Sequence, residues 1–414
     1  MPRITLLVSA VTAIAGLASA LPAVSTSYVD WKTFKATGVN LGGWFVQEQA
    51  IDTVWWATNC GTVSDEWTCC ANLGAQCGPV FNKRYATWIG KSDIDTLAAN
   101  NVTILRIPTT YAAWVKVPGS QLYSGDQARY LRKIATYAIK KYNMHIILDI
   151  HSLPGGINGV TIGEREGAFG WFYNATALSY SYKAISAAIG FIQHSRYPSH
   201  FTLEPINEPL DNVTLFGQPN ALSDHNAAYV ARYIQGVLSR VQAVNPRIPV
   251  MFQDGFKGEA YFSPYFPPTA NLVFDIHHYY FAGRGAQSAT AEKLICAGKH
   301  APSEYTSEEM ILRSLADFST LDAKATVGDG KFPTFVGEWA IQTELDNLYV
   351  DRKKLLNTGL YAFNKYDHGS AYWTSKFKGT TPVDGQGTQA DYWNFEKFIA
   401  LGLVDAPSGA AYCP

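Results

Sequence analysis

Residues 145–151 have the sequence HIILDIH, and residues 201–208 have the sequence FTLEPINE. Both stretches are rich in apolar residues and lack the strict alternation of apolar and polar residues that a half-exposed strand shows. Such runs are typical of parallel strands that are buried on both faces. Each stretch closes on polar residues, His151 in the first and Glu208 in the second. The two stretches therefore predict buried parallel strands with polar side chains at their carboxyl ends.

Similar apolar runs recur along the whole chain, separated by longer helical patterns. The predicted strands lie near Gly38–Asn40, Val102–Pro108, His145–His151, Phe201–Glu208, Pro249–Asp254, Leu272–His278, Thr334–Glu338 and Ser370–Trp373. Helix candidates between them include Asp126–Tyr142, Tyr182–Gln193, Asp224–Val244 and Asp351–Tyr366. These units predict an α/β fold, a (β/α)8 TIM barrel in a single domain with long loops on the catalytic face. A doubly wound sheet is the alternative, but no G-x-G-x-x-G motif follows the first strand.

Two segments look like insertions into this barrel. Thr53–Val80 holds four cysteines and three tryptophans, and Gly283–Lys331 carries Cys296, a helical pattern over Ser307–Phe318 and a Gly-rich end. Insertions that follow barrel strands lie on the carboxyl-terminal face, so we expect both to wall the active site.

The composition excludes several classes of protein. The 414 residues include 33 Lys+Arg and 34 Asp+Glu, a net charge of −1, which excludes the basic excess of a nucleic-acid-binding protein. Hydrophobic residues make up 47%, which excludes a disordered chain. Charged residues are only 16% and aromatic residues 14%, a balance that suits a secreted protein with stacking surfaces.

The first twenty residues predict a signal peptide. Arg3 gives a positive start, Ile4–Leu17 is apolar, and Ala18-Ser19-Ala20 is a cleavage pattern, so residues 21–414 would be the mature catalytic domain. No later stretch reaches the roughly 18 apolar residues that a membrane span needs. We expect a secreted, extracellular protein with a carbohydrate or glycoside partner and no nucleic-acid or membrane partner. The sequence does not fix the oligomeric state, and a monomer is compatible with it.

The six cysteines agree with export, because an even count in a secreted chain predicts disulfides. They are Cys60, Cys69, Cys70, Cys77, Cys296 and Cys413. We expect the first four to pair among themselves, in an order left open, and Cys296 to pair with Cys413. Zinc is the alternative for the first four, but their spacing lacks a paired C-x-x-C. Three N-x-[ST] sequons, at Asn101, Asn174 and Asn212, predict exposed positions for glycans.

Polar residues stand at the carboxyl ends of six predicted strands, which is the catalytic face of a barrel. They are Arg106, His151, Asn207 and Glu208, His277 and Tyr279, Glu338, and Trp373. Glu208 and Glu338 belong to the fourth and seventh strands, so they face each other across the barrel. Two facing carboxyl groups predict glycoside hydrolysis, in which one group is a protonated acid and the other is ionised. Arg106 would keep Glu338 ionised through its charge.

Other chemistries find less support. The sequence has no G-x-S-x-G motif for a serine hydrolase and no H-E-x-x-H motif for a zinc protease. A metal pair is one reading of His277 and His278, but adjacent residues on a strand point to opposite faces, which favours a hydrogen-bonding role for one of them. We expect no metal and no cofactor.

Five motifs resemble fungal exo-β-1,3-glucanases, which belong to glycoside hydrolase family 5 in clan A. They are GVNLGGW at residues 38–44, LRIP at 105–108, NEP at 207–209, HHY at 277–279 and GEW at 337–339. The resemblance implies a retaining mechanism with Glu208 as acid/base and Glu338 as nucleophile. It implies substrate contacts from Glu48, Arg106, His151, Asn207, His277, Tyr279 and Trp373. It makes Glu204 a structural residue inside the barrel.

The loop after the third strand departs from the glucanases. Val160 and Thr161 stand where those enzymes place an aromatic and an acidic residue that close the pocket around a terminal glucose. This departure and the long segment 283–331 are more similar to the fungal rutinosidases (6-O-α-rhamnosyl-β-glucosidases) of the same family. The resemblance then implies release of rutinose, a disaccharide, from flavonoid glycosides. An exo-β-1,3-glucanase, a transglycosylase and a catalytically silent sugar-binding barrel are the alternatives, although both catalytic Glu are present.

Overall fold

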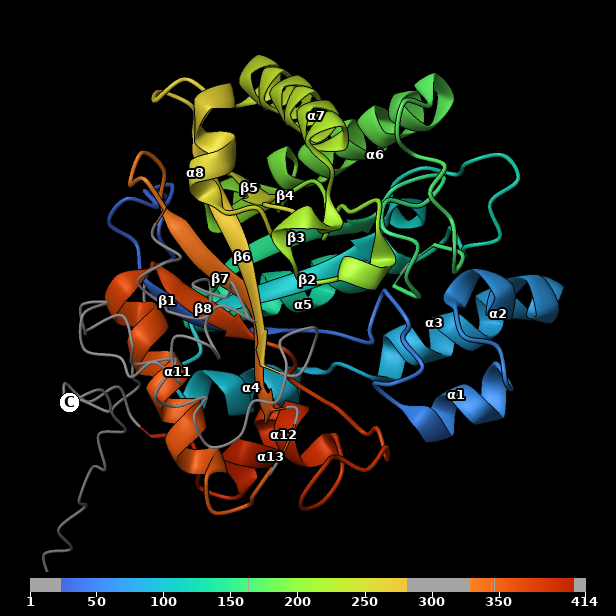
Figure 1. Cartoon of the computed structure of the whole chain (residues 1–414), viewed down its shortest axis with the longest axis vertical. Coiled ribbons are helices and arrows are strands. Elements are labelled where there is room, and N and C mark those ends of the chain that lie inside the picture. The colour runs from blue at the N-terminus through green and yellow to red at the C-terminus, as the bar shows by residue number, and fades with distance from the viewer. Residues whose placement is uncertain (1–23, 163, 281–327, 344, 346, 406–414) are drawn as a thin grey trace, which may run out of the picture.

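Eight parallel strands form a closed barrel in the computed structural model, in the order β1 to β8 (Figure 1). The structure describes residues 24–162, 164–280, 328–343, 345 and 347–405. The strands are β1 Ala36–Asn40, β2 Ile104–Thr110, β3 His145–Ser152, β4 Phe201–Glu204, β5 Val250–Gln253, β6 Leu272–Tyr280, β7 Thr334–Thr343 and β8 Gly369–Tyr372. The register between Ala36 and Gly369 closes the sheet on itself. The predicted TIM barrel is confirmed.

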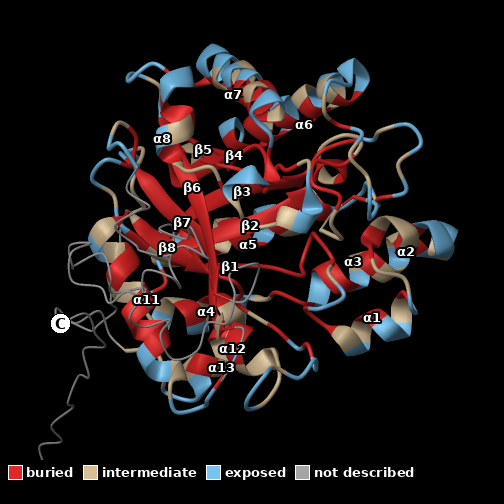
Figure 2. Ribbon diagram, viewed as in Figure 1, coloured by how far each residue is buried: buried red, intermediate tan, exposed pale blue. Residues whose placement is uncertain are grey.

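Helices cover the outside of the barrel. They are α1 Thr53–Asn59, α2 Glu66–Leu73, α3 Cys77–Thr87, α4 Lys91–Ala99, α5 Gln127–Tyr142, α6 Ala175–Gln193, α7 Asp224–Val244, α8 Glu259–Phe262, α11 Arg352–Tyr366, α12 Ala390–Trp393 and α13 Phe395–Ala400. Single 3-10 turns occur at Gly74–Gln76, Tyr111–Ala113, Pro198–His200, Val213–Leu215, Pro219–Ala221 and Ser263–Tyr265. Figure 2 shows that these helices bury the side toward the sheet and expose the side toward solvent. Among the described residues, no helix is both long and apolar enough to cross a bilayer.

Most predicted elements differ from the observed ones at one or both ends, and two of the differences have a clear local cause. The strand predicted over Phe201–Glu208 ends at Glu204, because the next residue is Pro205, which has no N–H for the ladder. The helix predicted from Tyr182 begins at Ala175, where the Asn174 side chain caps it by accepting the N–H of Ala177 at 3.0 Å. By contrast, α7 has the predicted bounds, and the Ser223 hydroxyl caps it as expected.

The barrel interior is apolar at the amino-terminal ends of the strands and charged toward their carboxyl-terminal ends. A buried cluster at the amino-terminal ends of the strands consists of Trp31, Ala36, Ile104, Ile147, Met251, Val273, Phe335 and Ala371. Side chains two residues further along a strand share its face. The next level above the apolar cluster therefore contains Arg106, Asp149, Gln253 and Asp275, all with 0% exposure. Charged groups are thus held between the apolar floor and the carboxyl-terminal mouth.

The insertion Thr53–Val80 forms α1, α2 and the start of α3, at the edge of the barrel in Figure 1. Disulfides join Cys60 to Cys69 and Cys70 to Cys77, so the prediction that these four pair among themselves is confirmed. Asp65 accepts the backbone N–H of Glu166 at 3.2 Å, which places α2 against the loop after β3.

Several predicted features lie outside the described residues. They are the signal peptide, Cys296, Cys413, and the second insertion up to residue 327. The three sequon asparagines lie within the described part, and all three side chains are exposed, as predicted.

Candidate active site

Arg106 lies at the centre of the charged network, with 0% exposure. Its Nε and Nη2 donate to the two carboxylate oxygens of Glu204 at 2.7 and 2.9 Å. Its remaining N–H groups donate to Asn40 at 3.0 Å, to Asn207 at 2.7 Å and to Glu338 at 2.6 Å. All five donors of the guanidinium are therefore used by protein atoms. The structure places Arg106 beneath the carboxylates as a support, without an N–H left for a substrate.

Glu338 projects from β7 into the mouth of the barrel and is 4% exposed. One oxygen accepts from Arg106, and the other accepts the hydroxyl of Tyr279 at 2.7 Å. Burial by itself would raise the pKa of Glu338, but the charges of His277 and Arg106 and the hydrogen bond from Tyr279 outweigh it and lower the pKa below its ordinary value. The ionised form of Glu338 is thus favoured, as the sequence predicts for this residue.

Glu208 follows β4, and its environment shifts its pKa in the direction opposite to that of Glu338. Its side chain is 3% exposed, and one oxygen accepts from His277 Nδ1 at 2.7 Å. Burial raises the pKa of Glu208, the bond from His277 opposes that change, and the charge of Glu338 adds to it. The backbone of Glu208 has a φ of 46°, a left-handed conformation that is strained for a residue with a side chain. This turn after Pro205 directs the carboxyl group toward Glu338.

The two carboxyl groups lie close together. An oxygen of Glu208, an oxygen of Glu338 and a ring nitrogen of His277 are all within 4.8 Å of one another. A retaining glycosidase needs its two carboxyl groups about 5–5.5 Å apart, whereas an inverting one needs about 6.5–9.5 Å to admit a water molecule. The geometry therefore agrees with the short separation of the retaining class.

His277 joins the groups that could coordinate a metal, together with either Glu208 and Glu338 or Glu204 and Asp275. Both nitrogens of His277 already face carboxylate oxygens, Nδ1 toward Glu208 and Nε2 toward Asp275 at 3.2 Å. Although burial opposes the cation, the charges of Glu338 and Asp275 raise the pKa of His277 well above its ordinary value. A doubly protonated ring has no lone pair for a metal, so these contacts favour a hydrogen-bonding role.

The other predicted contact residues lie around the same mouth. His151 donates through Nδ1 to Asp149 at 2.6 Å, and its ring stacks on Trp373 at 5.9 Å between centroids. The amide of Asn207 lies 3.3 Å from His151 Nε2. Glu48 is partly buried, and its Oε1 is enclosed without a hydrogen-bond partner among the described residues.

The pKa of the Glu48 carboxyl group is also shifted from its ordinary value. Burial, and then the charges of Glu338 and Glu208, raise the pKa of Glu48 well above its ordinary value. A protonated carboxyl group with an unused oxygen at the mouth of the barrel can both donate to and accept from a sugar hydroxyl.

The residues around this site that sequence reasoning missed include Asp275, Asn40 and Trp393. Asp275 lies two positions before His277, so its strand face could have been deduced from the alternation alone. Asn40 lies inside the GVNLGGW motif of residues 38–44, and its contact with Arg106 joins two different strands. Trp393 comes from α12, and its ring stacks on Tyr279 at 5.4 Å. No local pattern around Trp393 could have shown this contact, because it joins segments more than a hundred residues apart.

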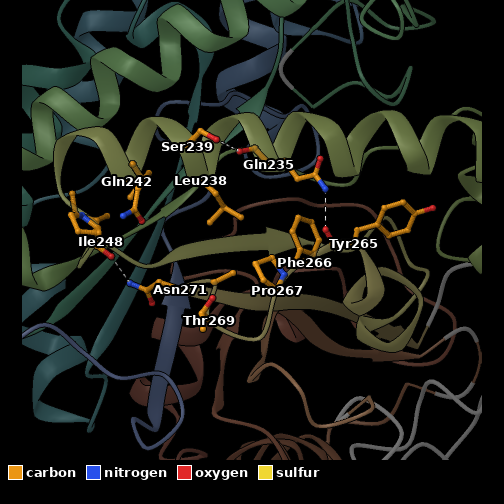
Figure 3. Close-up of a pocket in the computed structure, with 13 residues that line it drawn as sticks. Gln235, Leu238, Ser239, Gln242, Ile248, Tyr265, Phe266, Pro267, Thr269 and Asn271 are labelled. Atoms are coloured by element: carbon orange, nitrogen blue, oxygen red, sulfur yellow. Dashed lines mark hydrogen bonds between the residues drawn. The ribbon is translucent and has the colours of Figure 1, made fainter.

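A separate groove of about 450 Å³ lies on the outer surface, between α7 and the connection from β5 to β6 (Figure 3). Gln235 donates to the carbonyl oxygen of Tyr265 at 2.9 Å, and Asn271 donates to that of Pro246 at 3.2 Å. Asn271 immediately precedes β6. The groove therefore reaches the amino-terminal ends of the strands, away from the carboxyl-terminal mouth that holds Glu208 and Glu338.

A parallel barrel whose mouth holds two carboxyl groups at short separation, with pKa values shifted in opposite directions, is the arrangement of a retaining glycoside hydrolase. Comparison with known families agrees, because the family Cellulase (glycosyl hydrolase family 5) matches residues 72–379. The chain belongs to this family.

Relatives within the family include glucanases and rutinosidases. The chain is 27% identical to a probable glucan 1,3-beta-glucosidase A from Aspergillus niger, over 96% of this chain and 86% of the relative. A crystal structure of rutinosidase from Aspergillus niger is 51% identical, with a TM-score of 0.84 over 92% of this chain and 100% of that one. The structure of AoRut is 53% identical, with a TM-score of 0.84 over 92% of this chain and 99% of that one. The protein is a rutinosidase-like glycosidase of family 5.

Proposed function

We propose that Glu338 is the nucleophile and Glu208 the acid/base of a β-glucosidic bond hydrolase that works by double displacement. The observation that carries the proposal is the opposite shift of the two pKa values within a separation of 4.8 Å. Neighbouring carboxyl groups whose environments push their pKa values apart are suited to act as an acid and an ionised group at one pH.

The two steps follow from these protonation states. The ionised Glu338 attacks the anomeric carbon while the protonated Glu208 gives its proton to the departing glycosidic oxygen. A covalent glycosyl-enzyme forms, and the leaving group departs. Glu208, now ionised, removes a proton from water, which attacks the same carbon and frees Glu338. Two inversions give a product of retained configuration.

We propose contacts to the sugar from Glu48, His151, Asn207, Tyr279 and Trp373. The enclosed oxygen of Glu48 supports this assignment, since a substrate hydroxyl would satisfy it. Trp373 supports it through its aromatic face, which can stack on a sugar ring. Arg106 and His277 are proposed to act on the carboxyl groups, because their donors already face protein atoms.

For the substrate, we propose a flavonoid diglycoside from which a disaccharide such as rutinose is released. The 51% identity to a rutinosidase supports this over the 27% identity to a glucan glucosidase. Val160 and Thr161 offer a smaller and less polar wall than an aromatic and an acidic residue would. The N–H of Leu210 donates to the carbonyl oxygen of Ile157 at 3.0 Å, which ties the loop of Val160 to the segment after Glu208. The loop can therefore border a second sugar.

We also propose that the protein is secreted. The two disulfides of the insertion support an oxidising destination, and residues 1–20 have the pattern of a cleaved signal peptide.

Product analysis with rutin, p-nitrophenyl β-glucoside and laminarin tests the substrate. Release of rutinose from rutin without free glucose is expected. Glucose from laminarin would instead favour an exo-β-1,3-glucanase, which the similarity to the glucan glucosidase supports as the second candidate.

Azide rescue tests the two roles. Glu338→Ala should abolish hydrolysis, and azide should restore turnover with an inverted product. Glu208→Ala should impair poor leaving groups far more than p-nitrophenol, and azide should then give a product of retained configuration. If the two rescue products had the configurations exchanged, the assigned roles would be reversed.

A further inference from the structure

Strand β7 carries one extra residue immediately before Glu338. Along β6, Ile276 pairs with Val336 while the next residue, His277, pairs with Glu338, so Gly337 has no partner. The pairing of β7 with β8 also skips one residue over this stretch. Such a bulge changes the alternation of side chains. Glu338 therefore points into the barrel, where an uninterrupted strand would turn it outward.

Two buried polar side chains hold the extra residue. Asp275 Oδ1 accepts the N–H of Gly337 at 2.5 Å, and Asn40 Nδ2 donates to its carbonyl oxygen at 2.8 Å. Both side chains have 0% exposure. A Cβ atom on Gly337 would lie 2.1 Å from each carboxylate oxygen of Asp275, so only glycine leaves room for this contact. The backbone of the bulge and the carboxylate of Asp275 thus fit as one unit.

The second oxygen of Asp275 is connected to the carboxyl group of Glu208 through His277. Oδ2 accepts from His277 Nε2 at 3.2 Å, and His277 Nδ1 donates to Glu208 at 2.7 Å. Arg106 lies 3.6 Å from the same oxygen. The charged or titratable groups that face Asp275 are Arg106, Glu204, Asp254 and His277.

We infer that Asp275 is a positioning residue that fixes the bulge at Gly337 and thereby aims Glu338 at the anomeric carbon. The inference rests on the proposed role of Glu338 as nucleophile. The carboxylate of Asp275 is 0% exposed and contacts Gly337, His277 and Arg106. Its effect is exerted through the backbone of β7, where Asp275 accepts the N–H of Gly337 and Asn40 donates to the carbonyl oxygen of the same residue.

The first measurement is the kinetics of Asp275→Ala and Asp275→Asn on p-nitrophenyl β-rutinoside or β-glucoside, whichever the parent protein cleaves. Asp275→Ala frees the N–H of Gly337, so kcat should fall roughly 100-fold with little change in KM, the loss expected for a misplaced reacting group. Asp275→Asn keeps an oxygen for that N–H and should recover most of kcat. The acidic limb of the pH profile of Asp275→Asn should move to higher pH. His277 loses a partner that stabilises its charge, and the charge of His277 is one of the causes that lower the pKa of Glu338.

The second measurement separates aiming from general support of the fold. In the Glu338→Ala background, azide replaces the carboxylate that Asp275 would aim. Adding Asp275→Ala there should change the azide-dependent rate by less than about 3-fold, because the two substitutions act on one function and are not additive. An equal loss in both backgrounds, or no loss of kcat in Asp275→Ala alone, would overturn the inference.

Asp254→Ala is the matched control. Asp254 is also a buried carboxylate at a strand end, but its oxygens accept backbone N–H groups of Phe256 and Gly258, both at 2.8 Å. Asp254→Ala should change the rate by the same factor in the parent protein and in the azide-rescued Glu338→Ala background. If Asp275→Ala fails to fold, Gly337→Ala replaces it, since its methyl group displaces the carboxylate, and the same pattern is expected. Full activity of Glu338→Ala without azide would overturn the proposed nucleophile and this inference together.

Discussion

Removing the hydroxyl of Tyr279 should move the acidic limb of the pH profile upward. The hydroxyl donates to Glu338 at 2.7 Å inside a buried site, and this bond lowers the pKa of Glu338. A hydrogen bond to a charged group is worth about 1.5–3 kcal/mol. Since 1.36 kcal/mol corresponds to one unit, Tyr279→Phe should raise the pKa of Glu338 by about one to two units. The proposed mechanism requires ionised Glu338, so activity should be lost at a correspondingly higher pH as acid is added.

The assay is the pH dependence of kcat/KM on a p-nitrophenyl glycoside, which reports the pKa values of the free enzyme. The phenylalanine ring keeps the stacking on Trp393, so the change is confined to one hydroxyl. Tyr233→Phe is the control, because Tyr233 is a buried tyrosine whose hydroxyl donates to the carbonyl oxygen of Pro205 at 3.0 Å. An acidic limb that stays in place in folded Tyr279→Phe, or moves equally in the control, would refute the reasoning.

Two further predictions concern stability and covalent structure. Burial raises the pKa of Glu66 to about 8, so the folded state keeps a proton that the unfolded state releases, and stability falls as pH rises from about 4.5 to 8. Between pH 5 and 7 this titration lowers the free energy of unfolding by about 2.5 kcal/mol, and Glu66→Gln should abolish that decrease. In calorimetry the decrease corresponds to a change of about 3 °C in Tm between the two pH values. The same pH dependence of Tm in Glu66→Gln would contradict the prediction. Peptide mapping without reduction should find Cys296 linked to Cys413, and either residue as a free thiol would disprove the pairing.

The sequence could predict the barrel because its signals are local. The run HIILDIH forms β3 with the predicted start, and α7 has the bounds that its pattern and cap indicate. Polar residues at strand ends located Glu208 and Glu338 for the same reason, since a parallel barrel brings all its carboxyl ends to one face.

The features that escaped prediction depend on neighbouring strands. The bulge at Gly337 is visible only when β7 is paired with β6 and β8. Simple alternation from Phe335 would have placed Glu338 on the outer face. The role of Arg106 likewise depends on how many acceptors surround it, and those acceptors come from β1, from β7, and from β4 and the segment that follows it. The resemblance in motif implied a substrate contact from Arg106. All five of its N–H groups donate to protein acceptors, which supports the proposal that Arg106 acts on the carboxyl groups.

The different roles proposed for the two carboxyl groups follow from the unequal number of hydrogen bonds that each group receives. Glu338 receives hydrogen bonds from Arg106 and Tyr279, whereas Glu208 receives one from His277. Because the groups lie within 4.8 Å, ionisation of Glu338 disfavours a second negative charge, and the proton remains on Glu208. Once a glycosyl ester forms on Glu338, that charge is gone while His277 still favours ionised Glu208. The pKa of Glu208 must then fall, which turns the acid of the first step into the base of the second without any movement of the side chain.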